Sequence, residues 1–295
     1  PAYATLRRAI SDDPLTPSSP AMAGRQKAEN GAGKLARGLA AHLPEPRDFD
    51  DWHYLTQVNQ ARALSLGVEH FRSHRPVCMG AVFWQLNDDW PVISWSTVDG
   101  DEHRKPVWYA MRRSFAPRLL TIQPREGGPV LVAVNDSVDD WTVPVEVARY
   151  TLAGEPRAKF GLDLSLPPLS SRTVELPAEL TRDTSGDELL RAYGSDGSTA
   201  WWFFAEDRDI AYPEARFTAS AEDSGGAVLV TVTAQTILRD LTLFPDRLDP
   251  SADVDDALVT LLPGESATFT VRSAQRVDAR DLLRRPVLRC VNDIR

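Results

Sequence analysis

The chain has 295 residues, of which 42% are hydrophobic and 25% are charged, a composition typical of a folded globular protein. Its formal net charge of −9 argues against a nucleic-acid or anionic-membrane partner, because such partners require a basic surface. No run approaches the roughly 18 consecutive apolar residues of a transmembrane helix, and no signal peptide opens the sequence. The length predicts two or three domains of roughly 100–150 residues each.

The first part of the chain is predominantly helical in pattern. A helix is predicted within residues 48–76, where Asp residues suited to N-capping precede a broad apolar face and an Arg-Pro step ends it. A shorter helix is predicted within residues 104–117. Residues 77–85 between them are apolar throughout and predict a strand buried on both faces, as in a parallel sheet. This order of helix, buried strand, loop and helix is typical of an α/β barrel.

Beyond residue 117 the sequence changes to short runs that alternate in polarity or are rich in β-branched residues. Gly, Pro, Asp and Ser separate these runs, which is the spacing of a β-sandwich. The runs are too many for one seven-stranded sandwich. We therefore predict two sandwiches, residues 118–208 and 209–295, joined within the Asp-rich, Pro-containing segment 206–215.

The stretch MGAVFWQLNDDWPVISWSTVDG, from Met79 to Gly100, combines three tryptophans with an asparagine and three aspartates. If residues 77–85 form a barrel strand, WQLNDDW lies at its C-terminal end, where barrel enzymes build their active sites. The indole face can take the C–H side of a pyranose ring, while Asn and Asp bind its hydroxyls. The alternative is that Trp84, Trp90 and Trp95 are core residues beneath a long loop, and the residues alone leave both interpretations open.

At this point the sequence resembles a known family. Residues 79–117 resemble the end of the barrel in β-mannosidases of glycoside hydrolase family two, in which a W-Q-L-N-D-x-W-P-x-x-S-W-S motif precedes the last barrel helix. The upstream residues 57–81 and the later WWFFAEDRDI, residues 201–210, fit the same pattern. The resemblance covers essentially the whole chain.

The resemblance implies an α/β plus all-β fold class. Residues 1–117 are expected to be the C-terminal part of a TIM (β/α)8 barrel, and residues 118–208 and 209–295 two immunoglobulin-like β-sandwiches. Family members are retaining enzymes that use two glutamates, and both are expected upstream of Pro1, so we expect no catalytic residue in this chain. The chain alone is therefore expected to be inactive, with the missing N-terminal part of the same enzyme as its partner.

The resemblance also implies substrate-binding residues. Trp84 matches the tryptophan that forms the hydrophobic platform for the mannose in the −1 subsite. Asn87 and Asp88 match the polar pair that follows, and are expected either to orient the loop or to bind hydroxyls. Trp90 matches an aromatic residue that serves as wall and packing. Family members commonly have an aromatic-Gly loop after the residue that matches Asp99, where this chain has GDEHRK, so contacts on the leaving-group side are left open.

The chain's own acids are poor substitutes for the glutamates. A retaining pair needs carboxyl groups about 5–5.5 Å apart, but Asp88 and Asp89 are adjacent and, in an extended segment, point to opposite sides. Asp99 and Glu102 are expected to be solvated loop acids, or supports for the basic residues that follow. No Ser/His/Asp elbow or phosphate-binding Gly loop is present, and no cofactor is expected.

The histidines and cysteines do not indicate a metal site. His70 and His74 are four residues apart on the predicted long helix, a spacing that permits a ligand pair but also fits a solvated helix face, which we favour. Cys78 and Cys290 lie far apart in sequence, so neither a disulfide framework nor a Cys-based metal site is expected.

Three functions compete on this evidence. The first is the C-terminal portion of an exo-β-mannosidase acting on terminal β-D-mannose of manno-oligosaccharides. The second is a sister activity on the same scaffold, a β-galactosidase, β-glucuronidase or exo-glucosaminidase. The third is a non-catalytic carbohydrate-binding module, for which the adjacent Trp201 and Trp202 are candidate residues. Oligomeric state stays open, and so does the compartment, with a cytoplasmic location slightly favoured.

Overall fold

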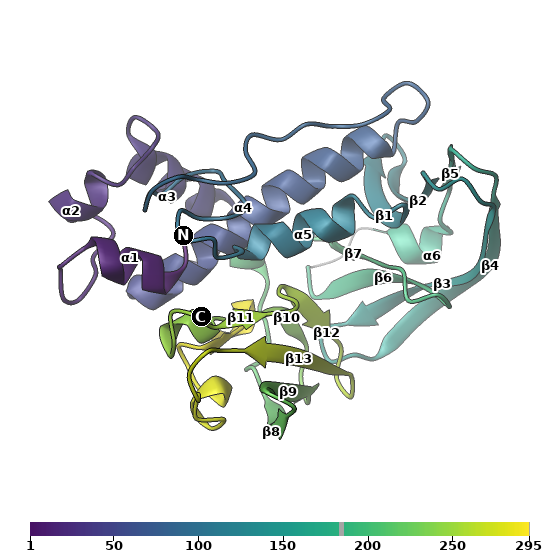
Figure 1. Cartoon of the computed structure of the whole chain (residues 1–295). Coiled ribbons are helices and arrows are strands. Elements are labelled where there is room, and N and C mark those ends of the chain that lie inside the picture. Colours follow the sequence, from purple (N-terminus) through teal and green to yellow (C-terminus); the bar gives the residue numbers. More distant parts are fainter. Residues whose placement is uncertain (183–185, 295) are drawn as a thin grey trace. The chain divides into compact units, whose positions relative to one another are not determined.

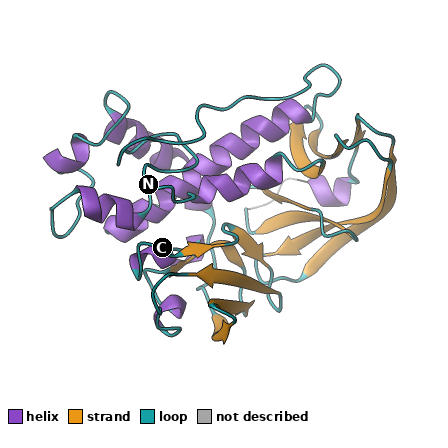
Figure 2. Cartoon of the chain, in the orientation of Figure 1, coloured by secondary structure: helices purple, strands orange, loops and turns teal. Residues whose placement is uncertain are grey.

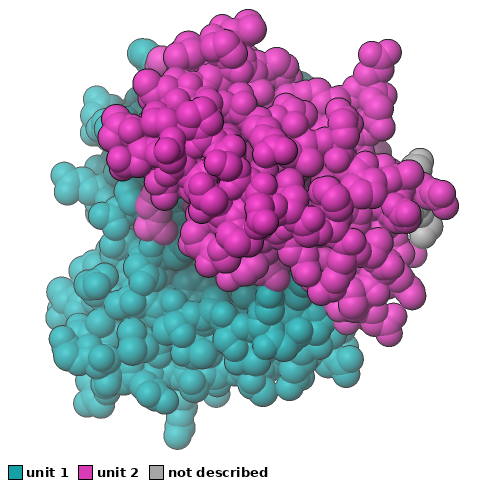
Figure 3. Space-filling view, turned by 90° about the vertical axis from the view of Figure 1, so that its right-hand side faces the viewer, with its two compact units in different colours: residues 1–62, 83–110, 213–295 teal, residues 63–82, 111–212 magenta. Residues whose placement is uncertain are grey.

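The computed structural model describes residues 1–182 and 186–294, with helices in the first part of the chain and antiparallel sheets after them (Figures 1 and 2). Two compact units are present. Unit 1 comprises residues 1–62, 83–110 and 213–295, and unit 2 comprises residues 63–82 and 111–212 (Figure 3). The division passes through the helices α4 (Phe49–Arg72) and α5 (Pro106–Ser114), so both units contain residues of each.

The helices of unit 1 begin with short elements and lead to α4. They are α1 (Tyr3–Ala9), α2 (Pro20–Ala23), α3 (Gly31–His42) and the first part of α4. The Asp48 carboxylate accepts a hydrogen bond of 2.8 Å from the Asp51 amide at the start of α4, which is the N-cap expected from the sequence. Tyr54, Leu55 and Val58 form the buried face of this part of α4. The two helices predicted within residues 48–76 and 104–117 are therefore confirmed as α4 and α5.

The C-terminal part of unit 1 is built from two antiparallel sheets. Their orders are β11-β13-β9-β8 and β12-β10-β14. The strands are β8 (Phe217–Ser224), β9 (Ala227–Ala234), β10 (Leu238–Leu243), β11 (Asp253–Val254), β12 (Val259–Leu261), β13 (Ser266–Arg272) and β14 (Leu288–Arg289). Short 3-10 turns, η2 (Pro245–Arg247), η3 (Asp281–Leu283) and η4 (Val291–Asp293), lie among them.

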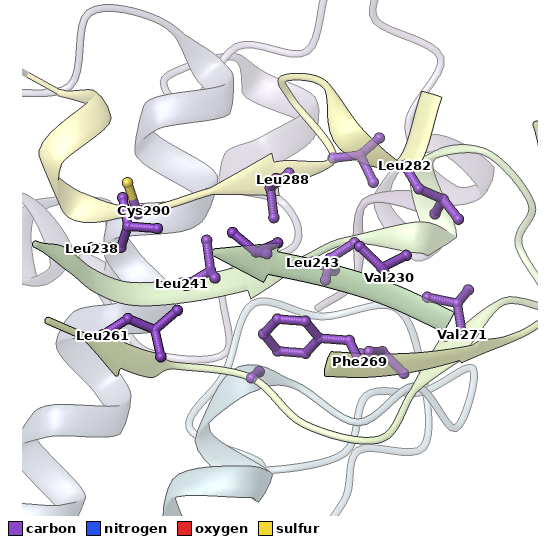
Figure 4. Packing of buried hydrophobic residues seen from close by; sticks show 14 of the residues in the cluster. Val230, Leu238, Leu241, Leu243, Leu261, Phe269, Val271, Leu282, Leu288 and Cys290 are labelled. Atoms are coloured by element: carbon purple, nitrogen blue, oxygen red, sulfur yellow. The ribbon is translucent and has the colours of Figure 1, made fainter. Parts of the chain in front are cut away.

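One apolar core joins these two sheets. Phe269 on β13, Leu241 on β10 and Leu288 on β14 are buried together in it (Figure 4). Tyr109 of α5 belongs to the same core, and its hydroxyl donates a hydrogen bond to the carbonyl of Val254 on β11. Helical and sheet parts of unit 1 thus share one buried interior.

Unit 2 also consists mainly of two antiparallel sheets. Their orders are β1-β2-β5 and β4-β3-β6-β7. The elements are β1 (Arg118–Arg125), β2 (Gly128–Asn135), β3 (Trp141–Thr151), β4 (Pro156–Leu166), β5 (Ser170–Val174), α6 (Ala178–Thr181), β6 (Glu188–Gly194), β7 (Thr199–Phe203) and η1 (Asp207–Asp209). Ile122 and Leu131 from the first sheet and Trp141 and Leu164 from the second lie in one core.

The predicted strand at residues 77–85 is not formed. This segment is a loop in which Val77, Met79 and Trp84 are exposed and Val82 is fully accessible to solvent, while its other apolar side chains are half-buried. An apolar strand buried on both faces needs hydrogen-bonding neighbours on both edges and cover on both faces. No strand pairs with this segment within the described residues, so its sequence preference for a strand has nothing to stabilise it.

The predicted strand runs otherwise correspond to β2 to β7, β9, β10, β12 and β13. The strands β1 and β8 and the two-residue strands β11 and β14 were not predicted. β1 contains a proline near its end, which argues against a strand, and β8 alternates small and polar residues after a single large apolar one. Among the described residues, no helix combines the length and apolarity that crossing a membrane requires.

We expect the core of unit 2 to depend on Trp141, which is fully buried and donates a 2.9 Å hydrogen bond from its indole nitrogen to Asp196. Trp141→Ala should lower the free energy of unfolding by about 3–5 kcal/mol, because it leaves a large cavity. Val138→Ala, at an exposed position of the same unit, should change it by less than about 0.5 kcal/mol. Urea unfolding followed by circular dichroism measures both, and equal effects would contradict this assignment.

Candidate functional site

The candidate site is the loop of residues 84–105 in unit 1, here called the Trp loop. Trp84 is 74% exposed, and Trp90 and Trp95 are 38% and 36% exposed. The peptide bond between Trp84 and Gln85 is cis. Large exposed aromatic side chains clustered in one short segment indicate a binding surface rather than core packing. The core alternative is thus disfavoured most clearly for Trp84.

Main-chain hydrogen bonds hold the Trp loop in a defined shape. The amide of Asp88 donates to the carbonyl of Val98 over 3.1 Å, and the amide of Val98 donates to Leu86 over 2.8 Å. The Asn87 side chain is exposed, and its amide nitrogen lies 3.3 Å from the carbonyl of Asp88. Gln60 of α4 donates a 2.7 Å hydrogen bond to the carbonyl of Trp95. The exposed side chains therefore stand on an ordered backbone.

Asp88 points into the protein rather than toward solvent. Its carboxylate is buried and accepts hydrogen bonds from the hydroxyls of Ser94 and Ser96, the second at 2.5 Å. The ammonium group of Lys27 lies 3.4 Å from the other carboxylate oxygen. Because both oxygens are engaged, Asp88 ties the two ends of the segment 88–96 together, which favours the loop-orienting alternative.

Lys105, the last residue of the Trp loop, is the second buried charge of the site. Its ammonium nitrogen lies 3.3 Å from the carbonyl oxygen of Ser94. Burial lowers the pKa of Lys105 to about 8, although the carboxylates of Asp88 and Asp99 act in the opposite direction. The Trp loop therefore rests on a compact cluster of buried charges of both signs.

Asp99 anchors the far end of the loop. Its two oxygens accept hydrogen bonds from the amides of Ala2, Asp101 and His103, at 2.8, 3.0 and 3.0 Å. Burial opposes its ionisation, but the contacts with His103 and the Ala2 amide hold its pKa below the ordinary range. Asp99 is not a solvated loop acid, because it is buried and its oxygens accept hydrogen bonds from backbone N–H groups. The alternative expectation, that it supports the basic residues after it, agrees with its electrostatic effect on the buried Lys105.

His103 connects Asp99 to the C-terminal part of unit 1. Its Nδ1 lies 3.4 Å from Asp99 and 3.2 Å from the Thr5 hydroxyl, and its Nε2 lies 2.7 Å from the carbonyl oxygen of Pro250. The interaction with Asp99 raises the pKa of His103 to about 9, against the effect of burial. A charged imidazolium can donate at both nitrogens, which matches acceptors on both sides.

Trp90 is held by close packing. The guanidinium carbon of Arg25 lies 5.8 Å from the centre of its ring. A Cβ atom at Gly100 would lie 2.4 Å from the main-chain carbonyl of Trp90. Only glycine allows the two segments of the loop to approach this closely.

The other predicted candidates lie outside this arrangement. Asp88 is buried while Asp89 is exposed, so the two adjacent carboxylates do not share one environment. The rings of His70 and His74 in unit 2 are 4.5 Å apart, and Nδ1 of His74 lies 2.8 Å from the carbonyl of His70. Within residues 1–182 and 186–294, no group of three or more His, Cys, Asp or Glu side chains could hold a metal ion.

Sequence reasoning missed two partners of the loop carboxylates, the half-buried Lys27 beside Asp88 and the half-buried His103 beside Asp99. Lys27 lies 61 positions before Asp88, and no local pattern marks it as a partner. A Lys or His in a polar loop ordinarily indicates a solvated side chain. Only the fold brings Lys27 close to Asp88.

Comparison with known proteins shows a consistent similarity. No family model matches the chain. It is 26% identical to a β-mannosidase B of Aspergillus oryzae, covering 89% of this chain and 34% of that protein, and 26% identical to a β-mannosidase of Rattus norvegicus, covering 85% and 30%. The resemblance to β-mannosidases is therefore confirmed, and the chain spans about a third of the length of these curated relatives.

Solved structures agree. A β-D-mannosidase from Dictyoglomus thermophilum superposes with a TM-score of 0.84 at 26% identity, covering 98% of this chain and 36% of that one. An exo-chitosanase from Amycolatopsis orientalis superposes with a TM-score of 0.69 at 18% identity, covering 92% and 38%, and shares the fold.

We expect His103 to make stability depend on pH. Because its folded pKa of about 9 lies above the ordinary 6.5, its contribution is complete below pH 6.5 and is lost as the pH rises toward 9. At about 1.4 kcal/mol per pKa unit, the difference of 9 minus 6.5 corresponds to at most about 3.5 kcal/mol. His103→Gln should remove this dependence, measured by urea unfolding between about pH 6 and pH 9.

The matched control is His42→Gln, at an exposed histidine of α3. Lys105, whose folded pKa is lowered to about 8, adds stability above that pH in the parent chain and in both variants. The difference in unfolding free energy between each variant and the parent chain therefore isolates the contribution of the substituted histidine. An unchanged pH dependence in His103→Gln would contradict the proposed charge.

Proposed function

We propose that this chain is the C-terminal part of a retaining exo-β-mannosidase, which releases terminal β-D-mannose from manno-oligosaccharides or glycans. The observation that carries the proposal is the exposed Trp84 within the WQLNDDWP motif, on an ordered loop, in a chain similar to β-mannosidases over nearly its whole length. An exposed indole on a fixed backbone is pre-organised to stack on a flat apolar ring face, such as that of a pyranose.

The site residues divide into two roles in this proposal. Trp84 is the sugar platform, the exposed amide of Asn87 binds a hydroxyl, and Trp90 forms a wall of the subsite. Asp88 orients the loop from below, an assignment that its burial and its contacts with Ser94 and Ser96 support. The exposed residues Trp84, Asn87 and Trp90 bind the β-mannoside, and the buried Asp88 holds their loop in place.

The finer architecture belongs to the same proposal. Residues 1–117 would be the last part of a TIM barrel, and residues 118–208 and 209–295 two immunoglobulin-like sandwiches. The apolar segment 77–85 would then pair as a barrel strand with strands contributed by the remainder of the enzyme. The exposed side chains of Val77, Met79 and Val82 support this, because contiguous exposed apolar surface usually marks an interface.

The chemistry follows from the division of labour. Retaining hydrolysis needs an acid/base and a nucleophile carboxylate about 5–5.5 Å apart, and we propose that the remainder of the enzyme supplies both glutamates. This chain supplies binding energy that is useful only when those groups are present. A sister activity on the same scaffold would differ in the aryl glycoside hydrolysed, so a panel of aryl β-mannoside, β-galactoside, β-glucuronide and β-glucosaminide distinguishes them.

Trp84→Ala in the full-length enzyme should lower kcat/KM for an aryl β-mannoside by roughly ten to a few hundred fold, which is about 1.4–3.5 kcal/mol. The ring flattened in the oxocarbenium-like transition state loses its stacking partner. Trp84→Phe should recover part of the loss. Because Trp84 is mostly exposed, its removal should change the melting temperature little. A variant that melts far earlier but keeps near-normal kcat/KM would show that Trp84 only packs.

Asp88→Ala should instead act through stability. It removes the acceptor of two hydroxyls and the counter-charge of Lys27 at a buried position, so it should lower the free energy of unfolding by about 2–4 kcal/mol. The adjacent, exposed Asp89→Ala is the matched control and should cost less than about 0.5 kcal/mol. Urea unfolding compares them. Normal stability combined with a large loss of kcat/KM would assign Asp88 to sugar contact.

A further inference from the structure

The outward face of the sheet β4-β3-β6-β7 in unit 2 carries an open groove. Its volume is about 460 Å³, within the roughly 300–1,000 Å³ range of small-ligand sites. Three neighbouring strands and the turn after β6 line it with Pro144, Glu146, Gly161, Asp163, Tyr193 and Ser195. The groove combines one aromatic ring, two carboxylates and a hydroxyl.

The strand register explains why these side chains meet. Neighbouring residues of a strand point to opposite faces, and Val143, Val145 and Val147 lie in the core, so Pro144 and Glu146 face outward. Because the pairing is antiparallel and regular here, the outward residues of β4 and β6 join them in rows across the sheet.

Each row has a defined composition. Glu146 pairs with Gly161 on one side and Tyr193 on the other. In the next row Pro144 pairs with Asp163, and the amide of Ser195 donates a 3.0 Å hydrogen bond to the carbonyl of Pro144. Adjacent strands lie about 4.8 Å apart, so a row over three strands spans about 10 Å.

Gly161 leaves the floor of the groove open. A Cβ atom built at this position meets nothing within 4 Å, and its backbone is not among the left-handed glycines. The fold therefore does not require glycine at this site. Its lack of a side chain makes room beside Tyr193 and Glu146 for a ligand.

Tyr193 forms a fixed aromatic platform. It is 45% exposed, yet the guanidinium of Arg191 lies 4.9 Å from its ring centre and 5.1 Å from that of Trp201 on the neighbouring strand. Stacking of this kind restricts the ring before a ligand arrives, which lowers the entropic cost of binding.

The charges of the groove select the ligand class. Lys159 contacts both carboxylate oxygens of the exposed Glu146, at 3.1 and 3.3 Å, and Asp163 is exposed in the next row. The remaining lone pairs of both carboxylates face solvent and can accept from hydroxyls. The two carboxylates stand beside the cations of Lys159 and Arg191, so the groove has no excess of either charge to attract an ionic ligand. Charged residues are also depleted from the centres of protein interfaces. A neutral ligand with an apolar face and many hydroxyls fits best, which is the chemistry of an oligosaccharide.

We propose that this groove binds a β-linked manno-oligosaccharide chain, with Tyr193 stacking on one sugar ring and Glu146 and Asp163 accepting from hydroxyls. The choice of mannose rests on the proposed function, whereas the sugar-binding character rests on the groove itself. The site gives unit 2 a means to retain polymeric substrate.

Affinity gel electrophoresis of this chain in soluble β-mannan tests the proposal. All variants carry Trp84→Ala, so that the Trp loop does not contribute. Tyr193→Ala and, separately, Gly161→Val should each raise the dissociation constant for mannan at least tenfold. Tyr193→Ala removes the aromatic platform, and Gly161→Val fills the floor of the groove. Phe71→Ala, which removes an aromatic side chain of similar exposure in the same unit, is the matched control and should migrate as the parent. Circular dichroism checks that each variant is folded.

Retardation of the parent that both groove variants lose and the control keeps would support the proposal. Retardation that the groove variants keep, or a parent that mannan does not retard, would overturn it. If a soluble cellulose derivative retarded the parent as strongly as mannan does, and both groove variants lost that retardation, the choice of mannose would be overturned. The proposed function has a separate readout, because hydrolysis of a small aryl β-mannoside by the full-length enzyme should stay within about twofold in Tyr193→Ala.

Discussion

Buried carboxylates beneath the Trp loop are the interaction on which the candidate site depends. Asp88 closes the segment 88–96 through two serine hydroxyls, and Asp99 closes the following turn through three backbone amides. A buried charge is costly unless it is paired and fully hydrogen-bonded, so this arrangement strongly favours one loop conformation. This loop conformation fixes the positions of the exposed tryptophans. It explains how side chains that face solvent can form a defined surface.

The charge cluster is itself supported by the interior of unit 1. His103 bridges Asp99 and the carbonyl of Pro250, and Tyr109, four residues after Lys105, enters the core of the C-terminal sheets. The C-terminal sheets of unit 1 thus fix the far end of the Trp loop. The same loop carries Trp84, the candidate sugar platform. This coupling gives the C-terminal sheets a structural role in the site, since the loop could not keep the same anchor without them.

Much of the secondary structure could be predicted from sequence. The caps and apolar face of α4 and the alternating runs of β3 and β13 are local signals, and each element formed where its pattern lay. The apolar residues 77–85 gave an equally clear strand signal, but a strand needs neighbours and none is present among the described residues. The weakly patterned β8 shows the converse, because pairing with β9 makes it a strand.

For the candidate site, the residue types are evident from the amino-acid sequence. Trp84, Asn87 and Trp90 lie within one short segment that resembles the β-mannosidase motif. Their residue types supply the indole rings and the amide that can bind a sugar. Which of these side chains face solvent and which are buried follows only from the folded structure. Asp88 turns inward because Lys27 and two serines reach it there, and residues distant in sequence meet only when the chain folds.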